Sequence, residues 1–293
     1  MAGLTIRPMT PDDVPEAERV SDEGFFDLDT RRQRVSGPAP ERRSDRHRAV
    51  WIERTRHLVG TDPGGCWVAE DETGMVGMAT SYRRETLWCL ATYAVLPGRQ
   101  GQGIGKPLLA AALDHGRACT RGMLSSSSDA KAVRVYHQAG FALHPQMYLT
   151  GTIDRSTLPV VEKIREGTAA DIDLMDSLDR GARGAGHGPD HELMLRTWRL
   201  LVSDTTTGSG YAYLNERGQL ALLAASNRRT ATRLLWGALA DGPEDVMIGH
   251  VTGANQWVLD VGFAARLELH QEGYLGLRGM KPPAPYVHSG ALL

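Results

Sequence analysis

The stretch Val95-Leu-Pro-Gly-Arg-Gln-Gly-Gln-Gly-Ile-Gly105 decides how the first half of this chain is interpreted. It follows a run typical of a buried strand (residues 87–96) and precedes a run typical of a helix (residues 106–117). A glycine-rich turn at a helix N-terminus leaves several backbone N–H groups without partners, and the helix dipole adds positive potential there. Because glycine has no Cβ, the backbone can approach a ligand closely. We therefore expect this turn to bind a phosphate or pyrophosphate.

The spacing of the glycines excludes the two commonest phosphate-binding loops. Gly101, Gly103 and Gly105 are spaced G-x-G-x-G, whereas the dinucleotide fingerprint requires G-x-G-x-x-G. The nucleoside-triphosphate loop requires a glycine where Gln100 stands and Ser or Thr where Pro107 stands. Neither type of nucleotide site is expected here.

The stretch instead resembles the pyrophosphate loop of the GCN5-related N-acetyltransferases (the GNAT superfamily), whose pattern is Q/R-x-x-G-x-G/A. Here the pattern reads Gln100-x-x-Gly103-x-Gly105. The resemblance implies that acetyl-CoA binds at this loop and that a splayed fourth strand supplies further backbone N–H groups. The residues that it assigns to the cofactor are Ala94, Val95, Leu96, Gln100, Gly101, Gln102, Gly103, Ile104, Gly105, Lys106 and Asp129.

A second family element follows about 25 residues later. The family pattern N-x-x-A-x-x-x-Y, ending in Gly-Phe, is matched by Asp129, Ala132, Tyr136, Gly140 and Phe141, with Asp in place of Asn. Asp129 is a good helix N-cap, Gly140 is a good terminator, and helical spacing puts the first three residues on one face. The resemblance covers roughly residues 4–150. It implies that Asp129 meets the pantetheine arm and that Tyr136 is the general acid that protonates the departing thiolate.

The general base is left open by the sequence. Many relatives carry a glutamate on the fourth strand, but the corresponding residue here is Ala91. Glu85, Glu23 and Asp27 are alternatives, as is a chain of water molecules. Tyr93 is a weaker alternative to Tyr136 as the acid, and we expect it to belong to the strand core.

An internal repeat sets the domain organisation. The motif Ile6-Arg7-x-x-Thr10-x-x-Asp13 recurs as Ile164-Arg165-x-x-Thr168-x-x-Asp171, and residues 65–79 and 210–224 both read as hairpins. An offset of 126 then aligns Leu108-Leu109 with Leu234-Leu235, Asp129 with Asn255, and Leu143-His144 with Leu269-His270. The repeat predicts an α/β (α+β) protein with two tandem GNAT-like domains, residues 1–153 (the first copy) and 161–293 (the second copy). In each we expect a mixed, largely antiparallel sheet flanked by helices.

The second copy has lost the residues that carry the chemistry. The three glycines of the loop align with Asn227, Arg229 and Ala231, and Tyr136 aligns with Gly262. We expect this degenerate copy to keep the fold and shape the substrate pocket without binding cofactor.

Composition excludes several classes of function. The chain has 293 residues, is 41% hydrophobic, and has a net charge of −2, so no overall bias toward polyanions exists. No apolar run is long enough to cross a bilayer, and the first residues lack a signal-peptide core. The three cysteines have no metal-ligand spacing. We expect a reduced, cytoplasmic protein without zinc or any other metal, bound to neither membrane nor nucleic acid.

Residues 31–56 are rich in arginine and could suggest nucleic acid, but acidic residues are interspersed and Trp51 is the only aromatic residue there. We interpret the segment as a solvated loop and helix flank near the substrate entrance, with recognition of a substrate carboxylate as an alternative. The arginines are Arg31, Arg32, Arg34, Arg42, Arg43, Arg46, Arg48, Arg54 and Arg56.

The C-terminal residues 282–293 are rich in proline and end apolar. Frayed tails are usually polar, so we expect this one to dock, either where the two halves join or as edge packing within the second domain.

The expected function is transfer of an acetyl group from acetyl-CoA to a primary amine of a small molecule, by direct attack on the thioester. An acyl-CoA-binding regulator without turnover and a protein or peptide acetyltransferase are alternatives. We expect a monomer, with the two copies as an intrachain pseudo-dimer, or a homodimer.

Overall fold

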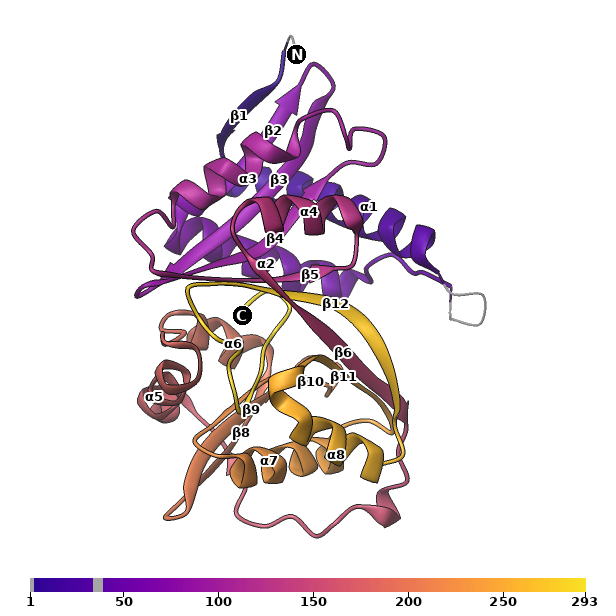
Figure 1. The fold of residues 1–293 in the computed structure, drawn as a ribbon, viewed down its shortest axis with the longest axis vertical. Coiled ribbons are helices and arrows are strands. Elements are labelled where there is room, and N and C mark those ends of the chain that lie inside the picture. Colours follow the sequence, from indigo (N-terminus) through magenta and orange to yellow (C-terminus); the bar gives the residue numbers. More distant parts are fainter. Residues whose placement is uncertain (1–2, 34–38) are drawn as a thin grey trace. The chain divides into compact units, whose positions relative to one another are not determined.

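The protein, described by a computed structural model over residues 3–33 and 39–293, divides into two compact units (Figure 1). The first unit comprises Met1–Arg83 and Trp88–Cys119, and the second comprises Arg84–Leu87 and Thr120–Leu293. Across the described residues, no helix is long and apolar enough to cross a membrane.

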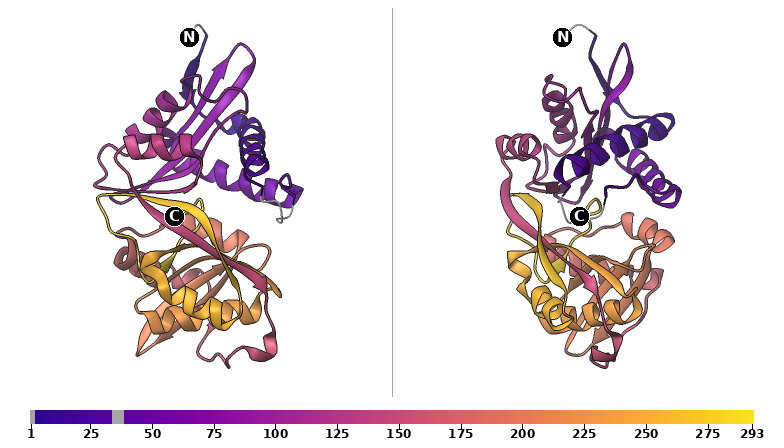
Figure 2. Two further views of the ribbon diagram at one scale, coloured as in Figure 1. Left: turned by 45° about the vertical axis from the view of Figure 1, so that its right-hand side comes forward. Right: turned by 90° about the vertical axis from the view of Figure 1, so that its right-hand side faces the viewer.

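The first unit is a sheet with the strand order β1-β2-β3-β4, flanked by helices. Helices α1 and α2 lie on one face of the sheet and α3 on the other (Figure 2). Pairing of β1 with β2 and of β2 with β3 is antiparallel. The elements are β1 (Thr5–Pro8), η1 (Pro11–Asp13), α1 (Val14–Arg32), α2 (Asp45–Thr61), η2 (Pro63–Gly65), β2 (Cys66–Asp71), β3 (Gly74–Arg84), β4 (Leu87–Val95) and α3 (Gly105–Asp114).

The second unit contains a sheet segment in which strands of the two sequence copies alternate, in the order β5-β12-β6-β11. Strand β12 pairs antiparallel with both β5 and β6, and β6 pairs antiparallel with β11. The last strand of each copy is therefore exchanged, because β12 of the second copy lies beside β5 of the first and β6 lies beside β11. The elements are β5 (Arg121–Ser127), α4 (Ala130–Gln138), β6 (Ala142–Thr152), η3 (Arg155–Thr157), β11 (Asp245–Thr252), η5 (Gly253–Asn255), α8 (Gln256–Ala264) and β12 (Glu268–Arg278).

The remaining strands of the second unit form a separate sheet with the order β13-β10-β9-β8-β7. Helix α7 packs on β8, β9 and β10, and buried apolar side chains such as Leu234, Leu223 and Ile248 belong to one continuous core. The elements are β7 (Arg165–Glu166), η4 (Ala169–Asp171), α5 (Ile172–Arg183), α6 (Asp190–Thr197), β8 (Arg199–Thr205), β9 (Gly208–Leu214), β10 (Leu220–Ala225), α7 (Arg228–Asp241) and β13 (Tyr286–Val287).

The structure confirms both predicted hairpins but corrects their equivalence. Residues 65–79 become β2 and β3, and residues 210–224 become β9 and β10. Strand β10 directly precedes α7, as β4 precedes α3, so β9 and β10 correspond to β3 and β4. Hairpin sequences carry only an alternating pattern and a turn, and these two signals do not distinguish successive hairpins of a meander.

The C-terminal tail packs within the second unit. Strand β13 pairs antiparallel with β10, and Leu292 and Leu293 are 1% and 0% exposed. For Tyr286 and Val287 this is the edge packing that the sequence predicts as one of two possibilities, and the burial of the last two side chains fits an apolar end.

The repeated N-terminal motif makes the same contacts in both copies. The guanidinium of Arg7 donates two hydrogen bonds to Asp13, at 2.7 and 2.8 Å, and Arg165 pairs likewise with Asp171. In each copy the aspartate also accepts the backbone N–H of a threonine, Thr10 or Thr168. The carboxylate thus ties a first strand to the helix that follows, which is the physical reason for the repeated spacing.

We predict that Asp13→Asn and Asp171→Asn each lower the free energy of unfolding at pH 7 by roughly 1–2 kcal/mol. The hydrogen bond from Arg7 lowers the pKa of Asp13 in the folded protein. The carboxylate therefore stabilises the fold above its unfolded pKa of about 4, and this contribution disappears as the pH falls through the folded value. Urea unfolding of wild type and variants at pH 7 and pH 3.5 measures the effect. A difference that grew in acid would contradict the prediction.

Candidate functional site

The predicted glycine loop, residues 96–104, connects β4 to α3 in the first unit. Gly98, Gly101 and Gly103 have φ values of 77°, 80° and 82°, in the left-handed region that side chains disfavour. The Gln100 amide donates to the Val95 carbonyl at 3.2 Å, and the Gln102 amide donates to the Gly98 carbonyl at 2.9 Å. Both glutamine side chains therefore stabilise the loop by bonding to its own backbone. The sequence analysis assigned both residues to the cofactor instead.

No side chain of the described residues caps the N-terminus of α3. Its N-cap residue is Ile104, whose buried apolar side chain cannot accept a hydrogen bond from the first turn. Lys106 is exposed in that turn and adds positive charge. The first backbone N–H groups of a helix have no acceptor within the helix, so this end suits an anion.

A tyrosine of β4 leaves no room for a side chain at Gly105, the first residue of α3. A Cβ at position 105 would lie 2.2 Å from the Tyr93 hydroxyl, so no larger residue fits without displacing that ring. Burial raises the pKa of Tyr93 to about 12. Tyr93 therefore keeps its proton at neutral pH. Its hydroxyl also lies against the start of α3, so the residue is not only part of the strand core. The sequence spacing gave no signal for this contact.

The end of β4 orients alternate backbone groups in opposite directions. The N–H of Leu96 donates to the Val76 carbonyl of β3 at 2.9 Å, so this group is used within the sheet. Since successive residues of a strand alternate, the N–H of Val95 points away from β3. Ala94 is buried at 7% exposure. Of the three assigned backbone positions, Val95 is therefore the one whose N–H does not face β3.

The second motif lies on α4 of the second unit. The Asp129 carboxylate caps this helix by accepting the N–H groups of Lys131 and Ala132 at 2.9 and 3.1 Å. Tyr136 is 5% exposed, and the helix ends before Gly140, which has a φ of 88°. The predicted helix, its cap and its terminator are thus confirmed. The structure brings residues 94–106 together in one unit and places Asp129 and Tyr136 on α4 in the other.

The equivalent positions of the second copy lack the features that suit the first copy to a pyrophosphate. Only Ser226 and Asn227 separate β10 from α7, so the loop has been shortened as well as changed in sequence. The Asn227 side chain caps α7 by accepting the Thr230 N–H at 3.0 Å. A Cβ at Gly262 would lie 2.5 Å from Leu149, which leaves no room for a tyrosine. The second copy satisfies its helix N-terminus with its own side chain.

The carboxylates proposed as general bases take part in ion pairs. Glu23 lies 2.7 Å from Arg19, and Asp27 lies 2.9 Å from Arg31. Glu85 pairs with Arg180 at 2.7 Å and accepts the Gly186 N–H. All three carboxylates are thus engaged by arginine side chains.

The arginine-rich segment largely neutralises the acidic face of α1. Arg42 pairs with Asp22, and Arg43 and Arg48 both pair with Glu18. These contacts favour a structural role over a nucleic-acid surface. Arg34 lies outside the described residues.

The comparisons with known proteins agree with these features. The model of the acetyltransferase (GNAT) family matches residues 26–141. Among curated proteins, no sequence matches this chain significantly.

Three solved structures share the fold over nearly the whole chain. A candidate acetyltransferase from Pyrococcus horikoshii is 21% identical, with a TM-score of 0.75 over 100% of this chain and 96% of the other. A GCN5-related N-acetyltransferase from Sphaerobacter thermophilus is 17% identical, with a TM-score of 0.58 over 94% and 95%. A tandem GNAT protein from the clavulanic acid biosynthesis pathway is 14% identical, with a TM-score of 0.58 over 95% and 99%. In this chain the match to the acetyltransferase (GNAT) family is thus confined to residues 26–141, within the first copy.

Proposed function

We propose that this protein transfers an acetyl group from acetyl-CoA to a primary amine of a small molecule. The observation that carries the proposal is the contrast between the two copies. Helix α3 has the apolar Ile104 as its N-cap, behind a loop of left-handed glycines, whereas the Asn227 side chain caps α7. The first arrangement suits a pyrophosphate, whereas in the second a side chain already occupies one of the free N–H groups of the helix.

The chemistry needs few protein groups. The neutral amine nitrogen attacks the thioester carbonyl carbon, the C–S bond breaks, and the sulfur leaves with the electron pair. A backbone N–H such as that of Val95 stabilises the charge on the carbonyl oxygen. Tyr136 donates its phenolic proton to the sulfur, as the family pattern implies. The amine loses its proton to water, because Ala91 stands where relatives carry a glutamate.

The same lack of a base favours a second candidate function, an acyl-CoA-binding regulator without turnover. Such a protein would keep the glycine loop but need neither an acceptor pocket nor a base.

Release of free CoA thiol separates the two. The enzyme predicts that some members of a panel of amino sugars, polyamines, amino acids and aminoglycosides accelerate CoA release from acetyl-CoA, with a mass gain of one acetyl group on the amine. Tight acetyl-CoA binding with no acceleration by any amine of the panel would favour the regulator. Acceleration by peptides alone would move the acceptor to proteins.

A further inference from the structure

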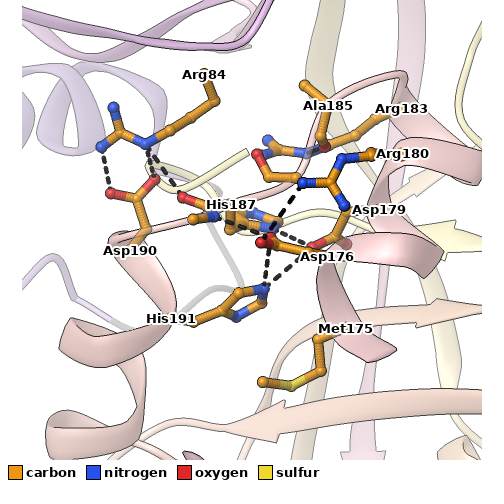
Figure 3. Close-up of polar contacts among 12 residues, drawn as sticks. Arg84, Met175, Asp176, Asp179, Arg180, Arg183, Ala185, His187, Asp190 and His191 are labelled. Atoms are coloured by element: carbon orange, nitrogen blue, oxygen red, sulfur yellow. Dashed lines mark hydrogen bonds and ion pairs between the residues drawn. The ribbon is translucent and has the colours of Figure 1, made fainter. Parts of the chain in front are cut away.

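A buried cluster of acidic and histidine side chains lies in the second unit, on elements that the proposed reaction does not use (Figure 3). Asp176 and Asp179 project from α5, His187 lies in the connection between α5 and α6, and His191 lies on α6. Asp179, His187 and His191 are each 0% exposed, and the side chain of Asp176 is 14% exposed. Isolated charges are costly at such a depth, and the Asp179 carboxylate is compensated by His187, His191 and the buried guanidinium of Arg183.

Two of the distances within the cluster have the length expected for the edge of a metal coordination shell. His191 Nε2 lies 3.3 Å from Asp179 Oδ2 and 3.4 Å from Asp176 Oδ1. His187 Nδ1 lies 2.7 Å from the same Asp179 oxygen. Ligands about 2.0–2.1 Å from a tetrahedral ion are roughly 3.3 Å apart. Two of the three separations have this value, and the third would open by about half an ångström on metal binding.

The orientation of His191 is a second, independent indication. Although two carboxylate oxygens lie near its Nε2, this atom makes a well-directed hydrogen bond to neither, among the described residues. A hydrogen bond would place an oxygen along the N–H direction. In a metal site the ion occupies that direction, and the other ligands lie to its sides. The arrangement around His191 is of this second kind.

We propose that Asp176, Asp179, His187 and His191 form a binding site for a divalent transition metal, zinc being the best match. Two imidazole nitrogens favour zinc over magnesium or calcium, which prefer oxygen ligands only. Two carboxylates neutralise the charge of the ion. The scattered cysteines, on which the expectation of no metal was based, take no part in this site.

The surrounding residues support a structural rather than a catalytic metal. The Tyr211 hydroxyl donates to the other oxygen of Asp179 at 2.6 Å, and Tyr213 lies 3.2 Å from the remaining nitrogen of His191. Such partners fix the orientation of ligating groups. Both tyrosines belong to β9, so the ion would fasten α5 and α6 to this strand. A site with four protein ligands has no open position for substrate.

Metal analysis of protein purified without a polyhistidine tag tests the proposal, with no dependence on acetyl transfer. We expect about one zinc per chain. Stripping with a chelator should lower the melting temperature, and zinc at a hundredfold excess over its Kd, but not magnesium, should restore about 5–10 °C. Cobalt(II) should give the visible absorption of a tetrahedral site.

Variants locate the ion. His187→Gln should abolish the zinc-dependent rise in melting temperature, and Tyr211→Phe should weaken zinc binding about 10–100-fold. His288→Gln, which alters an equally buried histidine that bonds Gln146 and Ser289, should retain full zinc binding. If His187→Gln does not fold, the wild-type comparison decides alone. Stripped wild-type protein that melts at an unchanged temperature and takes up no zinc would overturn the proposal and leave a hydrogen-bonded, proton-carrying cluster.

Discussion

Replacing Gly103 with glutamate is expected to weaken acetyl-CoA binding by at least about 100-fold while the protein stays folded. Gly103 has a φ of 82°, a conformation that costs a side-chain-bearing residue about 1–2 kcal/mol. Glutamate would also bring a negative charge to the loop that is proposed to hold pyrophosphate. Loss of even two hydrogen bonds to a charged group, at roughly 1.5–3 kcal/mol each, accounts for the expected factor.

The matched control is Arg229→Glu in the second copy, the position that aligns with Gly103. Arg229 is exposed in the first turn of α7, where a glutamate is compatible with the helix dipole. Calorimetric titration should give a Kd for acetyl-CoA within about twofold of wild type. Equal losses in Gly103→Glu and Arg229→Glu, with both variants folded by circular dichroism, would show that the two copies have been assigned wrongly.

Tyr136→Phe is expected to lower kcat by about 100-fold and to leave the Kd of acetyl-CoA unchanged. A general acid acts only as the C–S bond breaks, so its loss affects the transition state and not cofactor binding. The thiolate is a tolerable leaving group, which puts the expected loss at the lower end. Tyr136 is 5% exposed and the variant keeps its ring, so the melting temperature should change little.

Tyr93→Phe is the comparison that separates the two candidate acids. The Tyr93 hydroxyl lies against Gly105, and its pKa is raised to about 12, so this group also carries a proton at neutral pH. A larger loss of kcat in Tyr93→Phe than in Tyr136→Phe, with chemistry rate-limiting in both, would show that Tyr93 is the general acid.

Local features of the fold could be predicted from the sequence because each depends on short-range chemistry. The strand, glycine loop and helix around residues 87–117 follow from an apolar run, a cluster of residues without Cβ, and a helical stripe. The cap at Asp129 and the stop at Gly140 were predicted for the same reason. The repeated spacing of Arg7 and Asp13 reflects a contact between two residues that are close in sequence.

Features that depend on partners distant in sequence could not be predicted. Alternation in β6 and β12 shows which side chains are buried, but not which strand lies alongside, so the strand exchange gave no signal. The shortened connection before α7 was hidden by an alignment that matched residues one for one. His187 and His191 are close in sequence, but His187 lies before the start of α6, and Asp179 joins them only through folding.

The most direct test of the account is the number of acetyl-CoA molecules bound per chain. We propose that the cofactor binds at the loop before α3 and not at the N-terminus of α7, which Asn227 caps. Calorimetric titration of the full chain with acetyl-CoA should therefore give one site, and Gly103→Glu should eliminate it. Two equivalent sites per chain, or one site that survives Gly103→Glu and disappears in a variant of α7, would contradict the account.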